Sequence, residues 1–183
     1  DTTPRTFEMV SVPSMITDPG ERAKYLVEHY WDKFDFTDTA YVHLPEITEQ
    51  AVSNYIDLMK YVTPEVASSS IKSMMHKAET DSTVFAYMAD LYEKYLYDPN
   101  SPMRDESLYI NVLESILSAS VFDDANKIRP AHLLDLALKN RVGEAATDFT
   151  YTLADGKTGT LYNVKAPYLL SVSYTHLRAH ETS

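Results

Sequence analysis

The sequence predicts a mainly α protein: an irregular antiparallel bundle of about six helices, followed by a short β-hairpin. From about residue 18 to about residue 141, apolar residues recur at helical spacing, and residues that start or stop helices interrupt them at short intervals. After Gly143 the apolar residues alternate with polar ones, and three of the four glycines lie at positions 143, 156 and 159. The composition, 44% hydrophobic and 11% aromatic, is typical of a globular protein with a packed core.

The first two helices are predicted by apolar residues that share one helical face. Residues 21–36, ERAKYLVEHYWDKFDF, and residues 48–62, TEQAVSNYIDLMKYV, both show this spacing. The inward positions of the first are Leu26, Val27, Tyr30, Trp31 and Phe34; those of the second are Val52, Tyr55, Ile56, Met59 and Val62.

The third and fourth helices have clear boundaries. Thr63 is a suitable N-cap and Pro64 suits the first helical position, because proline pre-sets φ and its missing N–H would have been unpaired there. The fourth helix, residues 82–97, should stop near Pro99 and Pro102. The inward residues are Ala67, Ile71, Met74, Met75 and Ala78, then Val84, Phe85, Met88, Leu91, Tyr92, Tyr95 and Leu96.

Two more helices complete the predicted bundle. Residues 105–120 place Tyr109, Val112, Leu113, Ile116 and Leu117 inward, and a short last helix should start at Pro130 and end by Gly143. Short connections favour antiparallel neighbours. Paired helices of this size also occur in tetratricopeptide-like arrays, but no Gly/Ala/Pro signature returns at a fixed period, so a repeat-like superhelix stays the alternative.

The most buried side chains of the bundle should share this helical spacing. We expect them to include Trp31, Tyr55, Phe85, Met88, Leu91, Leu113 and Ile116.

The hairpin is predicted from period-2 alternation. Residues 148–153, DFTYTL, form the first strand, 154–157 the turn and 158–164, TGTLYNV, the return strand. Residues 165–170, KAPYLL, resemble a buried strand. Because an isolated hairpin is marginally stable, we expect it to be mobile or to dock on the bundle with Phe149, Tyr151 and Leu153 facing inward. The domain boundary is predicted near residue 145, giving a helical domain over 1–145 and strands over 146–171.

Charge and composition argue against several functions. The net charge of −11 would repel nucleic acid and anionic lipid surfaces, and no apolar stretch approaches the roughly 20 residues that span a bilayer. With no cysteine, the chain offers no disulfide, thiolate or zinc–thiolate site. The start at Asp1, without Met or an apolar leader, indicates a processed protein or a fragment.

No catalytic, cofactor-binding or metal-binding residue is predicted. The histidines before the C-terminal tail do not stand at the i, i+4 spacing of helical metal sites, and Ser68–Ser70 lacks the glycines of a nucleophile elbow and should be a polar helix face. Asp123 and Asp124 suit capping or a solvated turn better than a catalytic carboxylate pair. The histidines concerned are His29, His43, His76 and His132.

The chain has 14 tyrosines, many of them on predicted helix faces with Trp31. Such aromatic stripes usually form core with the hydroxyls at the rim. A peptide- or glycan-binding groove is the alternative, and the sequence alone does not separate the two.

Residues 146–170, ATDFTYTLADGKTGTLYNVKAPYLL, resemble the opening of thioredoxin-like domains of the peroxiredoxin and thiol–disulfide oxidoreductase type. The shared elements are an A-x-D-F strand at residues 146–149, T-L-x-D-G-K at 152–157, a strand with Leu161, and a central strand ending Tyr168, Leu169 and Leu170. In that family a Cys-x-x-C pair follows at the N-terminus of a helix, where the thiol pKa is lowered. This sequence departs from the pattern at Ser171, which puts the whole redox site in doubt.

The helical part, especially residues 15–42, MITDPGERAKYLVEHYWDKFDFTDTAYV, is similar to the helical domain of unknown function that precedes thioredoxin-like domains in exported lipoproteins of Gram-negative gut anaerobes. The resemblance covers most of residues 8–145. It implies a two-domain parent and a location in the periplasm or anchored to the outer membrane, but no catalytic residue.

The tail, residues 172–183, resembles a sequencing adapter in translation. Read in one frame, a widely used transposase adapter encodes residues 172–181, VSYTHLRAHE, and then an incomplete codon compatible with Thr182. We therefore expect this tail to be an artefact of a metagenomic reading frame, to contribute nothing to stability, and to hold no metal at His176 and His180 despite their i, i+4 spacing.

Two functions follow from the resemblances. In the first, the chain is the substrate- or partner-positioning front portion of an exported thioredoxin-like thiol–disulfide oxidoreductase and is itself inactive because it is truncated. In the second, the helical domain is a protein- or peptide-binding module on a non-redox thioredoxin-like scaffold. Neither implies a cofactor in this chain, and the expected partner is a protein or peptide, with no nucleic acid and no membrane span.

Overall fold

The protein is described by a computed structural model over residues 4–139, 141 and 143–170. Its contacts divide the chain into two compact units, residues 1–141 and 142–183, and each is described by itself. The tail at 172–183, with His176 and His180, lies outside the described residues.

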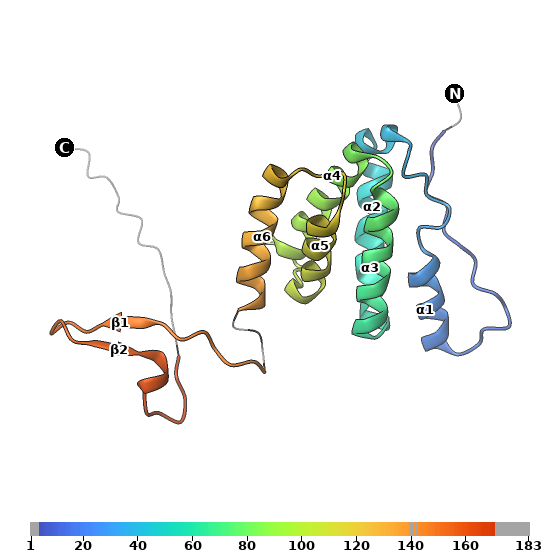
Figure 1. The fold of residues 1–183 in the computed structure, drawn as a ribbon. Helices are drawn as coiled ribbons and strands as arrows, with labels where there is room; N and C mark the ends of the chain where they lie inside the picture. The colour runs from blue at the N-terminus through green and yellow to red at the C-terminus, as the bar shows by residue number, and fades with distance from the viewer. Residues whose placement is uncertain (1–3, 140, 142, 171–183) are drawn as a thin grey trace, which may run out of the picture. The chain divides into compact units, whose positions relative to one another are not determined.

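The first unit holds six α-helices that follow one another from α1 to α6 (Figure 1). The predicted fold class, a mainly α bundle of about six helices followed by a short hairpin, is confirmed. The bounds are α1 Pro19–His29, α2 Pro45–Leu58, α3 Pro64–Ala78, α4 Ser82–Tyr92, α5 Glu106–Ser118 and α6 Asp124–Leu138. Short 3-10 segments cover Thr39–His43 and Met59–Tyr61, and a π-helical turn covers Glu93–Tyr97.

Side-chain caps explain where most of these helices begin. The Thr63 hydroxyl accepts from the Val66 N–H with Pro64 at the first position, so the predicted start of α3 is confirmed. In five helices a side-chain oxygen of the N-cap residue accepts a backbone N–H of the first turn. The five cap residues are Asp18, Thr63, Asp81, Asp105 and Asp123.

The predicted start of the last helix at Pro130 is wrong. α6 begins at Asp124, capped by the Asp123 carboxylate, and Pro130 lies inside it. The cap at Asp123 together with the packing of α6 on α5 outweighs the break expected at Pro130. Asp123 thus has the capping role expected of it.

The first helix is shorter than its apolar pattern. α1 ends at His29, and i→i+3 backbone bonds from Asp32 to His29 and from Phe34 to Trp31 form turns. The turns still direct Trp31 and Phe34 into the core, where they are 3% and 9% exposed.

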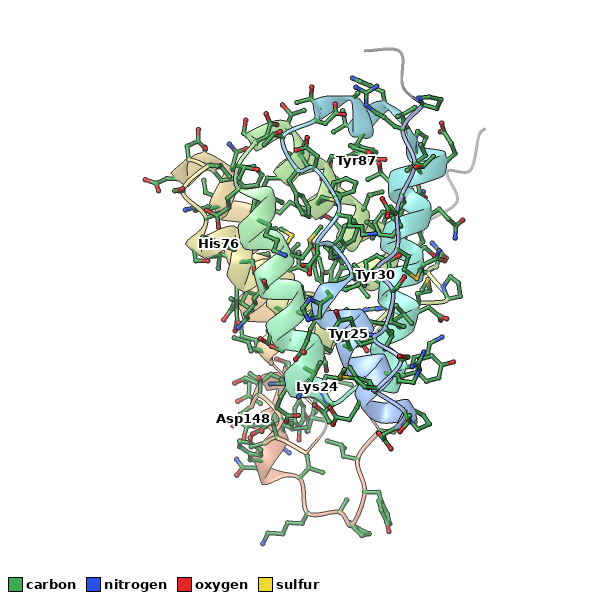
Figure 2. The ribbon with its side chains drawn as sticks, turned by 90° about the vertical axis from the view of Figure 1, so that its right-hand side faces the viewer. Lys24, Tyr25, Tyr30, His76, Tyr87 and Asp148 are labelled. Atoms are coloured by element: carbon green, nitrogen blue, oxygen red, sulfur yellow. The ribbon has the colours of Figure 1, made fainter. Side chains whose placement is uncertain are left out.

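The predicted core is confirmed, since the seven expected residues are each no more than 5% exposed. Aromatic rings fill the end of the unit near α1, where Tyr30 lies with side chains packed round it (Figure 2). The segment before α1 completes this cluster, because the ring of Phe7 lies 4.9 Å from that of Tyr30. The sequence did not predict this contribution.

Alternate helices run in the same direction. The Ser70 hydroxyl donates to the Val27 carbonyl, and Lys77 pairs with Asp32, so α3 follows α1 in parallel. Ser68 contacts Asn111 and Glu79 accepts from Ser120, so α5 follows α3 in parallel. Consecutive helices such as α3 and α4 are antiparallel, as predicted, with Met74 beside Tyr92. Stacked helix pairs of this kind occur in repeat proteins, although the sequence has no repeat.

The second unit holds a two-stranded antiparallel sheet, β1 Thr150–Thr152 and β2 Thr158–Thr160, with Tyr151 opposite Gly159. The Tyr151 ring lies over Gly159, where an added Cβ would come within 2.8 Å of Tyr151 Cζ. The predicted return strand is shorter than expected, since Leu161–Asn163 is a 3-10 turn.

Residues 165–170 do not form the predicted buried strand. Tyr168 is 92% exposed, and the described part of the chain offers only the two-stranded sheet, so no neighbouring strand supplies backbone partners. Phe149 and Leu153 are about half exposed. Docking of the hairpin on the bundle stays a prediction.

Candidate functional site

A groove runs between the parallel helices α3 and α5. It has two hollows: an apolar hollow of about 550 Å³ at the N-terminal ends of both helices, and a polar hollow of about 300 Å³ farther along. Glu114 on α5 lines both, so the hollows adjoin at this residue. We call the two together the α3–α5 groove.

The direction of the helices creates this groove. Because α3 and α5 are parallel, both begin at the same end of the unit, where the caps Thr63 and Asp105 lie. The Ser68 side chain contacts Asn111 across the groove near this end, and the ammonium of Lys72 lies 2.6 Å from the carboxylate of Glu114 one turn farther on.

The floor of the apolar hollow consists of buried core side chains. Ile56 and Met59 come from the end of α2 and its 3-10 extension, Ala67 from α3 and Ile110 from α5. All four are under 9% exposed, so the floor is set by the packing of three elements.

One wall is the loop 98–105, which a π-helical turn positions. Because this turn holds one residue more than an α-turn, it redirects the chain after α4. The Tyr95 hydroxyl donates to Glu49 on α2 at 2.7 Å, and the Ser101 hydroxyl donates to the Tyr95 carbonyl. Hydrogen bonds from Lys94 and then Tyr95 hold the pKa of Glu49 below its usual value, and burial with the Glu49 contact raises the pKa of Tyr95 to about 12. The wall is therefore anchored to α2.

Met103 and Arg104 are two of the loop residues that line the hollow. The sulfur of Met103 lies 3.7 Å from the Ser53 hydroxyl, and the Arg104 guanidinium pairs with Glu106 at 2.8 Å above the ring of Tyr97. The loop thus places a polarisable apolar group beside a cation.

Ser68 and Asn111 form the polar contact of the apolar hollow. The Ser68 hydroxyl donates to Asn111 Oδ1, and Asn111 Nδ2 donates to the carbonyls of Ser107 and Leu108. The donors of the pair are therefore used within the protein, while the oxygens keep lone pairs. The pair can accept hydrogen bonds from a ligand.

Cations and anions both line the mouth of the apolar hollow. Lys60 pairs with Asp57 and Arg104 with Glu106, whereas Arg141 has no ion pair among the described residues. The two anions in the lining are already engaged: Asp105 caps α5, and Glu114 pairs with Lys72.

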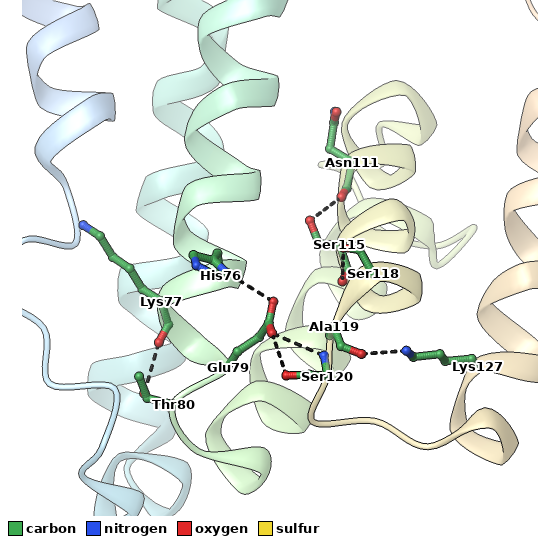
Figure 3. A network of polar contacts seen from close by, with 10 residues as sticks. All are labelled: His76, Lys77, Glu79, Thr80, Asn111, Ser115, Ser118, Ala119, Ser120 and Lys127. Atoms are coloured by element: carbon green, nitrogen blue, oxygen red, sulfur yellow. Dashed lines mark hydrogen bonds and ion pairs between the residues drawn. The ribbon is translucent and has the colours of Figure 1, made fainter.

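The polar hollow lies farther along the same two helices (Figure 3). His76 Nδ1 lies 3.4 Å from Glu79, whose carboxylate also accepts from the N–H and hydroxyl of Ser120. Ser115 and Ser118 donate to backbone carbonyls of α5. These are hydrogen-bonding groups, without a nucleophile and base in contact.

Comparisons with known proteins show the family of this chain and a similar solved structure. The sequence model of the family described as "Domain of unknown function (DUF5106)" matches residues 1–140. The chain belongs to the DUF5106 family. A crystal structure titled as that of a thioredoxin-like protein from Bacteroides caccae ATCC 43185 is similar, with 47% identity and a TM-score of 0.82. No curated protein matches the chain.

The match covers 90% of this chain and 59% of the Bacteroides caccae protein, so the chain spans little more than half the length of that relative. The predicted resemblance, a helical domain of unknown function followed by the start of a thioredoxin-like part, is confirmed. No helix of the described residues is long and apolar enough to cross a bilayer.

In this DUF5106 chain the histidines considered from sequence lie apart. His29 pairs with Asp32 and His76 with Glu79, while His43 ends a 3-10 segment and His132 lies on α6. The described residues hold no group of three or more His, Asp or Glu side chains that could bind a metal.

The serines do not form the uniform polar face that the sequence predicted. Ser69 is exposed, but Ser68 turns to the groove and Ser70 is 7% exposed inside the unit. The prediction was wrong for Ser70 because its hydroxyl bonds to the α1 backbone, which the sequence of α3 alone does not reveal. The prediction of core tyrosines is confirmed at Tyr30, Tyr55, Tyr92 and Tyr109.

Proposed function

We propose that the helical unit is the substrate- or partner-positioning part of a thioredoxin-like thiol–disulfide oxidoreductase of the cell envelope. The observation that carries the proposal is the 47% identity to a thioredoxin-like protein of which this chain spans 59%. The α3–α5 groove supports it, since it offers a preformed binding surface on the helical unit.

The redox groups would come from the natural protein beyond residue 170. The 183 residues contain no cysteine, and thiol–disulfide exchange requires a thiolate. In the proposed reaction a thiolate attacks one sulfur of a substrate disulfide and releases the other as a thiol. A second cysteine then attacks the mixed disulfide, so that two electrons pass from the enzyme dithiol to the substrate.

The test is insulin-disulfide reduction by this chain and by the natural protein that extends past Leu170. We expect turnover only from the longer protein, and its sequence should contain a Cys-x-x-C pair. Reduction by the 183-residue chain would refute the proposal, as would a longer protein with Cys-x-x-C that is inert toward all disulfides tested.

The groove favours a second candidate function, a peptide-binding module on a non-redox thioredoxin-like scaffold. If this second function is correct, no Cys-x-x-C pair should follow residue 170 in the natural protein. The genomic sequence beyond that residue therefore separates the two proposals.

A further inference from the structure

We propose that the α3–α5 groove binds an extended peptide segment of about six residues, with one large apolar side chain in the apolar hollow and an acidic group at the cations of its mouth. The inference rests on the proposed function and names the substrate class of the same site. It identifies the ligand as unfolded polypeptide rather than as a folded surface.

The length of the groove favours a peptide over a small molecule. α3 has 15 residues, from Pro64 to Ala78, and its two ends reach the two hollows. At about 1.5 Å per helical residue the groove is roughly 22 Å long. An extended chain rises about 3.3 Å per residue, so six or seven residues fill that length.

The apolar hollow suits one large side chain of varied shape. Its volume of about 550 Å³ lies within the range of ligand pockets, so it has room for any large apolar side chain together with the backbone beside it. Met59 and Met103 line this hollow together with Ile56 and Ile110, and flexible, polarisable methionine side chains adapt to different apolar groups. The apolar hollow should therefore accept any large apolar side chain of the ligand rather than one residue type.

The polar groups of the groove match the backbone of an extended chain. Ser68 Oγ and Asn111 Oδ1 can accept from a peptide N–H, because their own donors are engaged within the protein. Lys72 and Glu114 lie between the hollows as an exposed pair, and such surface pairs are weak in water, so a ligand can displace them.

The charge of the mouth selects an acidic residue beside the apolar one. In a chain of net charge −11, Lys60, Arg104 and Arg141 gather here; Lys60 is paired with Asp57 and Arg104 with Glu106, whereas Arg141 has no ion pair within the described residues. The lining anions Asp105 and Glu114 are engaged by the α5 backbone and by Lys72. A ligand carboxylate would meet the guanidinium groups of Arg104 and Arg141, which bind carboxylates in bidentate geometry.

Fluorescence anisotropy tests the proposal with the full 183-residue chain. The probes are fluorescein-labelled hexapeptides with a central Leu, Phe or Met flanked by Asp and Glu. Matched peptides carry Lys in place of both acids or Ser in place of the apolar residue. We expect the acidic–apolar peptides to bind at least tenfold more tightly than either matched set.

Two pairs of variants localise the binding. Ser68→Trp fills the apolar hollow, whereas Ser69→Trp adds the same ring on the exposed side of α3. Arg104→Glu reverses a charge at the mouth, whereas Lys24→Glu does so on α1, away from the groove. We expect at least a tenfold loss of affinity for Ser68→Trp and Arg104→Glu and less than a twofold change for the controls, with thermal unfolding showing that each variant is folded.

The outcomes separate this inference from the proposed function. If no acidic–apolar peptide binds, or if both variants of each pair bind these peptides equally well, the ligand assignment is overturned. This holds even if Ser68→Trp slows disulfide reduction by the longer protein, a result that would support the proposed function alone. If the peptides bind as expected but Ser68→Trp leaves that reduction unchanged, the ligand assignment stands and substrate positioning is refuted.

Discussion

At the scale of single residues, a chain of buried hydrogen bonds joins the first three helices. The Ser70 hydroxyl on α3 donates to the Val27 carbonyl of α1 at 2.8 Å, so the Tyr55 hydroxyl on α2 must be the donor in its contact with Ser70. Tyr55 is fully buried, and burial raises the pKa of its hydroxyl, which therefore stays protonated. One serine thus satisfies polar groups on two other helices.

Ser70→Ala should lower the free energy of unfolding by about 2–3 kcal/mol, because it leaves the Tyr55 hydroxyl and the Val27 carbonyl unpaired in the core. Tyr55→Phe should cost only about 1 kcal/mol, since Ser70 keeps its bond to Val27. Urea unfolding measures both. Ser69→Ala, on the exposed side of the same helix, is the control and should change stability by less than about 0.5 kcal/mol. Equal effects of Ser69→Ala and Ser70→Ala would contradict the bonding described.

At the scale of elements, the start of a helix could be predicted where neighbouring residues favour the same first position. It could not be predicted where a cap residue and a helix-breaking residue favour different positions. Thr63 and Pro64 agree with each other, and α3 begins where they predict. At α6 the cap residue Asp123 and the breaker Pro130 disagree, and the cap with its packing against α5 prevails. Residues 165–170 have the composition of a strand, but a strand also needs a partner, which composition does not supply.

Pro130→Ala should stabilise the helical unit by about 1–2 kcal/mol. Proline inside a helix lowers the free energy of unfolding by about 3 kcal/mol, because it cannot donate a hydrogen bond to the carbonyl four residues earlier, here that of Asn126. It also raises that free energy by about 1 kcal/mol, because it makes the unfolded chain stiffer. Thermal unfolding measures the gain. Pro64→Ala, at the first position of α3, is the matched control and should bring no gain, since the N–H it restores has no helical partner. A loss of stability in Pro130→Ala would mean that the ring fills a needed place against α5.

At the scale of the whole molecule, the α3–α5 groove could not be predicted from the sequence. Its lining residues carry no motif, and Ser68 and Asn111 are 43 positions apart. They meet because alternate helices are parallel, which depends on how the helix pairs stack. The sequence also allowed a peptide- or glycan-binding groove, but it placed that groove on the tyrosines, four of which, Tyr30, Tyr55, Tyr92 and Tyr109, are buried in the core instead.

The helical unit should fold without the residues that follow it. All buried hydrophobic residues of the described chain lie between Val27 and Leu133, and the DUF5106 match ends at residue 140. A chain that ends at residue 141 should therefore keep the urea midpoint and the m-value of the helical transition, because the area exposed on unfolding the core is the same. The single tryptophan, Trp31, is 3% exposed among aromatic rings, so its fluorescence follows that core directly. Removal of residues 172–183 alone is the nested control and should likewise leave the midpoint unchanged. A loss of several kcal/mol in the 141-residue chain, with the nested control unchanged, would show that residues 142–171 stabilise the helices, and the hairpin would then have to be counted as part of their fold.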